Sequence, residues 1–186
     1  MPVLAAETQW FPEDLFDEGA AAGAADQQWW VFHARPRQEK SLARDLLKRQ
    51  VPFYLPLIAR RWRSRGRLMT SHMPLFSGYV FSRTDKKGRV TALSTQRIVR
   101  SLDVGDQDQL WHDLKQIHRL LVSGSAVTPE SRLTPGTPVE ICSGPLMGLK
   151  GKIIRSASGR RFLVEVDFIR RGASVLLDDF VLTKTF

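Results

Sequence analysis

The chain of 186 residues has a single cysteine, Cys142, and no apolar run long enough to span a membrane. One cysteine excludes an internal disulfide and fits a reducing compartment. Cys142 follows alternating apolar residues, so we expect a small buried hydrophobe on a strand rather than a reactive thiol. The first residues also lack the charged-then-apolar pattern of a secretory signal. These absences predict a cytoplasmic protein that makes no membrane contact.

Residue patterns typical of catalysis or metal binding are missing as well. None of the four histidines pairs with another histidine or with Cys142 at metal-ligand spacing, and His112 and His118 would lie on different faces of a helix. There is no Gly-x-Ser-x-Gly elbow and no phosphate-binding loop that ends in Lys-Ser or Lys-Thr. We therefore expect neither an enzyme nor a bound cofactor or metal.

Basic residues are absent from residues 1–28, which contain six acidic residues. Trp10, Phe11, Leu15 and Phe16 alternate with these acids, and a low-complexity tract follows at 19–25. This composition predicts a disordered acidic extension. Two interpretations remain open for it, a free tail and a segment that docks onto a partner.

Residues 29–122 carry the positive charge of the chain, with 19 basic and seven acidic residues. So concentrated a charge favours a polyanionic partner, with nucleic acid the first candidate, over a merely solvated surface. Hydrophobic periodicity predicts strands and helices in the order β-α-β-β-α-β-α, an α+β sandwich of helices on a mainly antiparallel sheet. The expected strands are 29–34, 53–58 (interrupted by Pro56), 78–81 and 98–102, and the expected helices are 39–50, 88–96 and 108–122.

A cluster of arginines lies between two of these strands and surrounds one tryptophan. A hairpin tip of this kind can bind phosphates through guanidinium groups and stack on a base through Trp62. Two further arginines at the end of the first strand extend the surface. The alternative is a solvated loop in which Trp62 packs against the body of the domain. The candidate nucleic-acid-binding residues are Arg35, Arg37, Arg60, Arg61, Trp62, Arg63, Arg65 and Arg67.

After a linker-like segment at 123–134, residues 135–186 consist of short β-prone runs that predict a small SH3-like barrel. Within residues 162–168 every second residue is apolar, as in a strand with one apolar face. Phe162, Val164, Val166 and Phe168 alternate with Leu163, Glu165 and Asp167. Two strands flank a glycine-spaced turn, where glycine supplies backbone angles or close approaches that a Cβ would block. The turn residues are Gly144, Pro145, Gly148 and Gly151.

Three motifs now resemble one family. The turn at 144–151 resembles a KOW motif, and Pro74-Leu75-Phe76-Ser77-Gly78-Tyr79-Val80-Phe81 resembles the Pro-Leu-Phe-Pro-Gly-Tyr-Val-Phe segment of the NusG family, with Ser77 in place of the second proline. Residues 168–175 resemble the final stretch of that family's barrel. The resemblance implies an NGN-type sandwich at 29–122 followed by a KOW barrel at 135–186.

The resemblance also implies a function, that of a monomeric bacterial transcription elongation factor acting in pausing, termination or antitermination. In the family, an apolar pocket receives the clamp helices of the largest subunit of RNA polymerase. His33, Phe76, Tyr79 and Phe81 match that pocket, although plain core packing explains the aromatic residues equally well from periodicity alone. A specialised paralogue of the RfaH type is favoured over the housekeeping factor.

The other partners follow from the same resemblance. Non-template or upstream DNA would meet the arginine-rich hairpin. Rho or a ribosomal protein would meet the barrel, at a face formed by Phe168, Ile169 and Arg170. The alternative function is a ribosomal-type KOW module that binds RNA.

Overall fold

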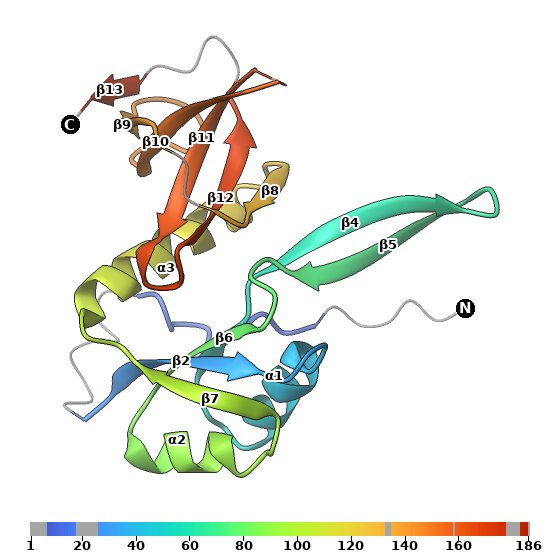
Figure 1. Ribbon diagram of the computed structural model, residues 1–186, viewed down its shortest axis with the longest axis vertical. Helices are drawn as coiled ribbons and strands as arrows, with labels where there is room; N and C mark the ends of the chain where they lie inside the picture. Colours follow the sequence, from blue (N-terminus) through green and yellow to red (C-terminus); the bar gives the residue numbers. More distant parts are fainter. Residues whose placement is uncertain (1–6, 18–25, 133–134, 158, 178–182, 186) are drawn as a thin grey trace. The chain divides into compact units, whose positions relative to one another are not determined.

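The computed structural model describes residues 7–17, 26–132, 135–157, 159–177 and 183–185. The chain divides into two compact units, one ending at Gln107 and the other beginning at Asp108 (Figure 1). Both contain antiparallel sheets, and helices are present in each, which confirms the predicted α+β class. The division follows the first residue of α3 (Gln107–Val122), whereas the sequence predicts it at the linker 123–134.

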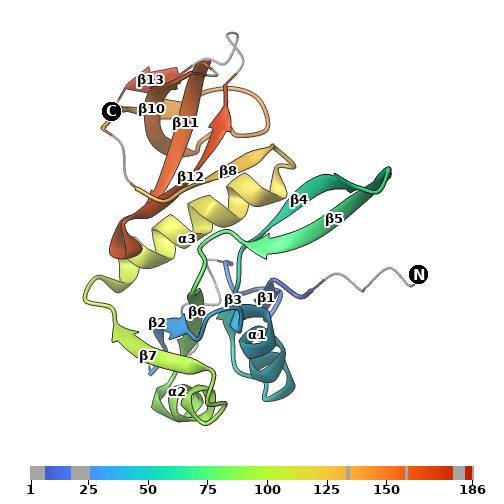
Figure 2. The same cartoon turned by 45° about the vertical axis from the view of Figure 1, so that its right-hand side comes forward.

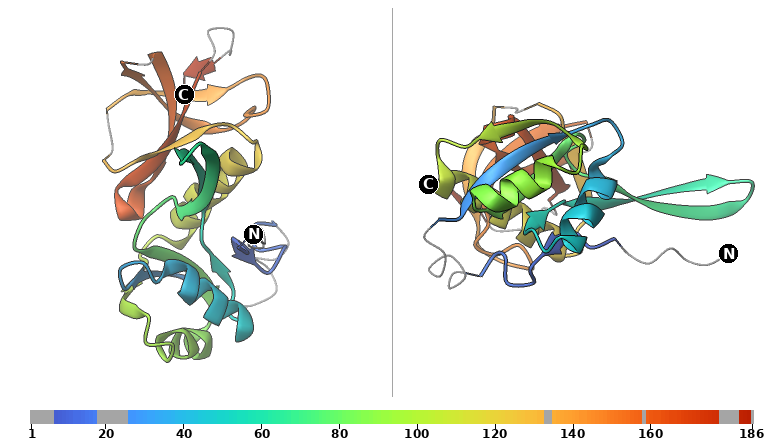
Figure 3. Two further views of the ribbon diagram at one scale, coloured as in Figure 1. Left: turned by 90° about the vertical axis from the view of Figure 1, so that its right-hand side faces the viewer. Right: turned by 90° about the horizontal axis from the view of Figure 1, so that it is seen from below.

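The first unit is built on a five-stranded sheet with the strand order β1-β3-β6-β2-β7. Two helices, α1 (Glu39–Lys48) and α2 (Lys86–Leu93), cover one face of this sheet (Figures 1 and 3). Leu42 and Leu46 of α1 are fully buried against it, as the spacing of apolar residues on one helix face predicts. The strands are β1 (Trp10–Phe11), β2 (Gln28–Ala34), β3 (Phe53–Tyr54), β6 (Tyr79–Thr84) and β7 (Ile98–Asp103).

Part of the acidic extension belongs to this sheet, which corrects the prediction of disorder for residues 7–17. Strand β1 pairs antiparallel with β3, and Leu15 and Phe16 are buried. The acids Glu13, Asp14 and Asp17 stay exposed. Composition alone suggests that a segment this acidic remains unfolded. Its apolar residues nevertheless pack against a surface formed by strands that are distant in the sequence.

The arginine cluster forms a separate two-stranded hairpin of β4 (Leu57–Ser64) and β5 (Arg67–Pro74), which extends away from the five-stranded sheet (Figure 2). Arg65 and Gly66 form its two-residue turn, and both have positive φ, of 48° and 76°. Such turns match the right-handed twist of the two strands. The predicted strand at 53–58 is divided, with β3 in the sheet and β4 in the hairpin.

The second unit contains α3 (Gln107–Val122) and a six-stranded, barrel-like antiparallel sheet in the order β13-β9-β10-β11-β12-β8. Strand β8 lies inside the predicted linker and pairs with β12. A short 3-10 helix at Asp167–Ile169 joins β11 to β12. The strands are β8 (Val127–Glu130), β9 (Thr137–Ile141), β10 (Lys150–Ser156), β11 (Gly159–Val166), β12 (Arg171–Leu176) and β13 (Thr183–Thr185).

Two sequence predictions for this unit need correction. Cys142 is exposed rather than buried, because β9 ends at Ile141. Phe168 is not on the apolar face of a strand, since β11 ends at Val166 and the 3-10 helix turns Phe168 toward solvent. Phe168 is 37% exposed, and Ile169 takes the buried position beside it.

Candidate partner-binding surfaces

The first candidate surface is the sheet face opposite α1 and α2, which we call the aromatic face. Along β2, Trp30 and Phe32 belong to the core beneath the helices, so the alternating residues between them face the other way. The strand register sets Val31 opposite Phe81 and His33 opposite Tyr79. The aromatic face comprises Trp29, Val31, His33, Tyr54, Tyr79 and Phe81.

Three of the four candidate polymerase-binding residues, His33, Tyr79 and Phe81, lie on this face, and the fourth, Phe76, packs against Phe81 from the loop before β6. The four differ in exposure. The Phe76 ring meets the Phe81 ring edge-on, with centroids 6.2 Å apart. His33 and Tyr79 form a second ring pair at 5.4 Å. Phe76 and Phe81 are only 1% and 0% exposed, whereas Tyr79 is half-buried and His33 is exposed. The core-packing interpretation therefore describes the two phenylalanines, and the open edge of the face is formed by His33 and Tyr79.

Gly78 explains how the loop before β6 reaches this arrangement. Its φ is +85°, and a Cβ there would lie 3.3 Å from the His33 ring. The Gly78 N–H donates to Glu39 Oε1 at 2.8 Å, and the Gly78 carbonyl accepts from the Ala34 N–H at 2.8 Å. The glycine thus fixes the loop to both α1 and β2 beside the imidazole of His33. Ser77, which replaces a proline of the resembled motif, is exposed.

Sequence reasoning did not identify Tyr54 and Phe16 as members of this face. Tyr54 lies 6.4 Å from Phe81, ring to ring, and the Phe16 ring meets Tyr54 edge-on at 4.8 Å. Phe16 also stacks on Trp29 at 6.2 Å. Burial raises the pKa of the Tyr54 phenol well above its ordinary value. The only signal in the sequence was the set of aromatic residues that interrupts the acidic extension.

The second candidate surface is the hairpin, whose two faces differ chemically. The register pairs Trp62 with Met69 and Ile58 with Met73 on one face. On the other face Arg61 and Arg63 stand opposite Thr70 and Leu68. Trp62 is 42% exposed and Leu68 66%, and residues 57–74 include no acidic residue to offset the five arginines. The hairpin therefore presents an exposed aromatic and methionine stripe together with positive charge.

A groove of about 750 Å³ lies between the start of α1 and the base of the hairpin. His33, at the open edge of the aromatic face, also lines it, so both candidate surfaces meet there. Arg35 and Arg37 are exposed at the end of β2, and Arg37 lines the groove. Sequence reasoning did not include the further groove residues Lys40, Arg44, Ser71, His72 and Met73.

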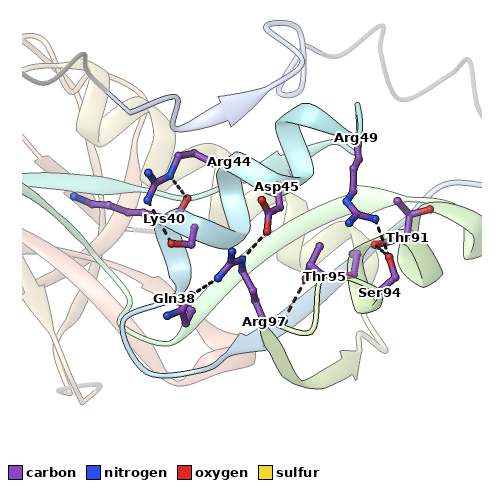
Figure 4. A network of polar contacts seen from close by, with 11 residues as sticks. Gln38, Lys40, Arg44, Asp45, Arg49, Thr91, Ser94, Thr95 and Arg97 are labelled. Carbon is purple, nitrogen blue, oxygen red and sulfur yellow. Dashed lines mark hydrogen bonds and ion pairs between the residues drawn. The ribbon is translucent and has the colours of Figure 1, made fainter.

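Other basic side chains near α1 have structural partners instead (Figure 4). The Arg97 guanidinium donates to Asp45 Oδ2 at 2.6 Å and also to the Gln38 side chain. Arg49 donates to Ser94 Oγ at 2.8 Å. These contacts hold α1 to the segment between α2 and β7, so Arg97 and Arg49 belong to the scaffold of the basic surface.

The glycines of the barrel turn meet the backbone requirements that their spacing predicts. Gly144 and Gly148 have φ of +79° and +80°. A Cβ on Gly151 would collide with the carbonyl oxygen of Leu163 on β11. These residues therefore shape the fold of the second unit. Of the candidate partner face, Phe168 and Arg170 are exposed and Ile169 is buried.

Two side chains of α3 form hydrogen bonds with the backbone of the barrel. Asp113 Oδ2 accepts from the Asp167 N–H at 3.0 Å, and Gln116 donates to the Lys150 carbonyl at 3.2 Å. Burial raises the pKa of Asp113, and the bond from Asp167 opposes that shift. A cavity of about 310 Å³ beside these contacts is lined by further polar side chains, including an ion pair of Lys152 and Glu165 at 2.6 Å.

Among the residues that the structure describes, no group of three His, Cys, Asp or Glu side chains could hold a metal ion. Within the same residues, no helix combines the length and the apolar character needed to cross a membrane.

The fold and these surfaces describe a two-unit α+β protein with a basic hairpin and an aromatic sheet face in its first unit. The chain belongs to the NusG family, because the family model described as transcription termination factor nusG matches residues 27–125. The match begins before β2 and ends after α3. The NusG family is a family of transcription factors.

The chain is similar to a solved structure described as domain interaction in Thermotoga maritima NusG, with 18% sequence identity and a TM-score of 0.45. That similarity covers 81% of this chain and 93% of the other. No curated protein sequence matches the chain.

Proposed function

We propose that this protein is a transcription elongation factor that binds RNA polymerase through the aromatic face and modulates pausing, termination or antitermination. The observation that carries the proposal is the family match over residues 27–125, which includes all four candidate polymerase-binding residues. The clamp helices of the largest polymerase subunit would contact His33 and Tyr79 at the open edge, with Phe76 and Phe81 behind them. Aromatic side chains that are buried near the centre of an interface commonly contribute most of the binding free energy.

The hairpin would contact the non-template strand or the upstream duplex. The exposed Trp62 supplies a stacking surface, and the arginines on both faces and at the tip supply phosphate contacts. The groove beside α1 would continue this path past Arg37, Lys40 and Arg44. A two-stranded ribbon without a covering layer also suits insertion between other molecules, because both of its faces are free to make contacts.

The barrel would recruit a further partner, Rho or a ribosomal protein, in the manner of a KOW domain. Phe168 and Arg170 are the exposed members of that face. Among the residues that the structure describes, no group of His, Cys, Asp or Glu side chains could hold a metal ion, and we propose a non-enzymatic factor. We also propose that it is cytoplasmic and monomeric.

Purification of the tagged full chain from cell lysate tests this proposal against a ribosomal RNA-binding role. We expect RNA polymerase core to co-purify in a stoichiometric amount. Replacement of His33 and Tyr79 with alanine should remove polymerase, while the exposed change Ser77→Ala should not. Sedimentation with ribosomal subunits alone would reject the polymerase-binding function.

A further inference from the structure

Residues 7–17 bind the first unit in the way that an extended peptide binds the edge of a sheet. Strand β1 pairs antiparallel with β3. The Leu55 N–H donates to the Gln9 carbonyl at 2.6 Å, and the Leu57 N–H donates to Gln9 Oε1 at 3.1 Å. In this mode of recognition, main-chain hydrogen bonds hold the segment and its side chains fill adjoining pockets.

Side chains that follow β1 pack against part of the aromatic face. Leu15 and Phe16 are buried, and Phe16 contacts both Tyr54 and Trp29. Tyr54 in turn contacts Phe81, which packs against Phe76. One continuous series of rings therefore connects the acidic segment to the candidate polymerase-binding residues.

The other end of the segment reaches the basic groove. Glu7 lies 3.8 Å from Arg44, one of the groove residues, in a partly exposed ion pair. The acids between the two ends, Glu13 and Asp14, are exposed. A single short segment thus contacts the aromatic face through apolar side chains and the basic groove through a carboxylate.

We propose that residues 7–17 are a built-in ligand of the first unit that RNA polymerase displaces, so that the segment lowers the affinity for polymerase. This inference rests on the proposed function. Phe16 of the segment packs on Tyr54, and Tyr54 packs on Phe81. Phe76 and Phe81 are buried, so a partner that contacts them directly needs an opening in this face. The segment is the element suited to leave, because it adds only two residues of strand to a sheet edge, whereas α1 and α2 cover the main core.

The first test compares polymerase binding by the full chain and by a chain that begins at residue 18. The apparent dissociation constant equals the intrinsic one divided by the open fraction, so removal of the segment should tighten binding by about fivefold or more. The double variant Leu15→Ala/Phe16→Ala should tighten binding in the same direction. Glu13→Gln/Asp14→Asn, which changes exposed neighbours in the same segment, serves as the matched control and should bind like the natural chain.

The second test needs no polymerase. A synthetic peptide of residues 7–17 is added to the chain that begins at residue 18, and amide exchange at Leu55 and Leu57 is followed. We expect both amides to exchange faster in the shortened chain and to regain protection when the peptide binds. In the complex of the full chain with polymerase, the same two amides should lose protection.

The outcomes distinguish the displacement of residues 7–17 from the proposed polymerase-binding function. Equal polymerase affinity with and without the segment, or unchanged protection of Leu55 and Leu57 in the complex, would overturn the inference and leave the proposed function intact. A shortened chain that neither folds nor takes up the peptide would also overturn it, because the segment would then be a permanent part of the core. Absence of polymerase binding by every variant would reject the function itself, and the displacement with it.

Discussion

The hairpin and the aromatic face carry the two candidate contact surfaces of the first unit, yet they differ in how much the fold depends on them. Phe76 and Phe81 are almost fully buried and pack against each other, while Trp62 on the hairpin is 42% exposed. A two-stranded ribbon without a second layer has no core of its own to maintain. Substitutions in the hairpin should therefore leave the fold intact, whereas the aromatic-face side chains maintain the fold in addition to their proposed role in binding.

The largest difference should be seen in stability. Phe76→Ala removes a fully buried ring and leaves a cavity, so we expect the free energy of unfolding of the first unit to fall by about 3–5 kcal/mol. Trp62→Ala on the hairpin should change it by less than about 1 kcal/mol, as surface substitutions usually do. Denaturant titration of the full-length variants measures both. Equal losses would show that the hairpin is part of the core.

The hairpin should instead dominate DNA binding. Replacing Arg61, Arg63 and Arg65 with glutamine should reduce the slope of log affinity against log salt by about 2–3, since each lost phosphate contact removes about 0.7–0.9. Fluorescence anisotropy with single-stranded and duplex DNA at several salt concentrations gives this slope. The variant Lys86→Gln/Lys87→Gln/Arg100→Gln removes the same charge from other exposed positions and should lower the slope by less than one unit. An equal change in both variants would show that the hairpin contributes to DNA binding only through the net charge of the protein.

A substitution at the open edge of the aromatic face should weaken polymerase binding with only a small loss of stability. Tyr79→Ala is expected to raise the dissociation constant for RNA polymerase about thirtyfold, because an aromatic anchor at an interface commonly contributes ~2 kcal/mol. Its unfolding transition should move less than that of Phe76→Ala, since Tyr79 is only half-buried. Unchanged affinity in a folded Tyr79 variant would remove this edge from the polymerase-binding surface.

The smallest expected effects are those of replacing two glycines, one in the hairpin and one beside the aromatic face. Gly66 and Gly78 both have positive φ, but a Cβ on Gly66 meets nothing within 4 Å, while a Cβ on Gly78 meets the His33 ring. Backbone strain of this kind costs about 1–3 kcal/mol. Gly78→Ala should lower the stability of the whole first unit by that amount, whereas Gly66→Ala should speed amide exchange in the hairpin alone. Global destabilisation by Gly66→Ala would show that the hairpin folds cooperatively with the sheet.

Several features of the fold could be predicted because their causes are local. The apolar spacing of Leu42 and Leu46 predicts the buried side of α1, and the glycines at 144, 148 and 151 predict a turn with unusual backbone angles and a close approach. The segment at 74–81 carried the family resemblance that the match over residues 27–125 supports. The arginines around Trp62 predicted an exposed hairpin, since so dense a charge is costly to bury.

The remaining features depend on contacts between distant residues. Alternation along β2 and β6 shows that successive side chains face opposite ways. Apolar residues occur on both faces of β2 and at the start of β6, so the pattern cannot tell which phenylalanines become covered. The burial of Phe16 on Tyr54 joins residues 38 positions apart in the chain, and the bond from Asp167 to Asp113 joins residues 54 apart.

The sequence by itself determined the α+β class, the basic hairpin and the positions where glycine is required, because each follows from a residue's own backbone preference, charge or spacing. Only the tertiary structure decided that the acidic segment completes a sheet, that Phe16 packs against Trp29 and Tyr54, that Phe76 and Phe81 are buried and that α3 belongs with the barrel. The physical reason is that burial depends on which surfaces meet. A partly apolar segment remains disordered or folds according to whether another part of the chain offers it an edge and a face.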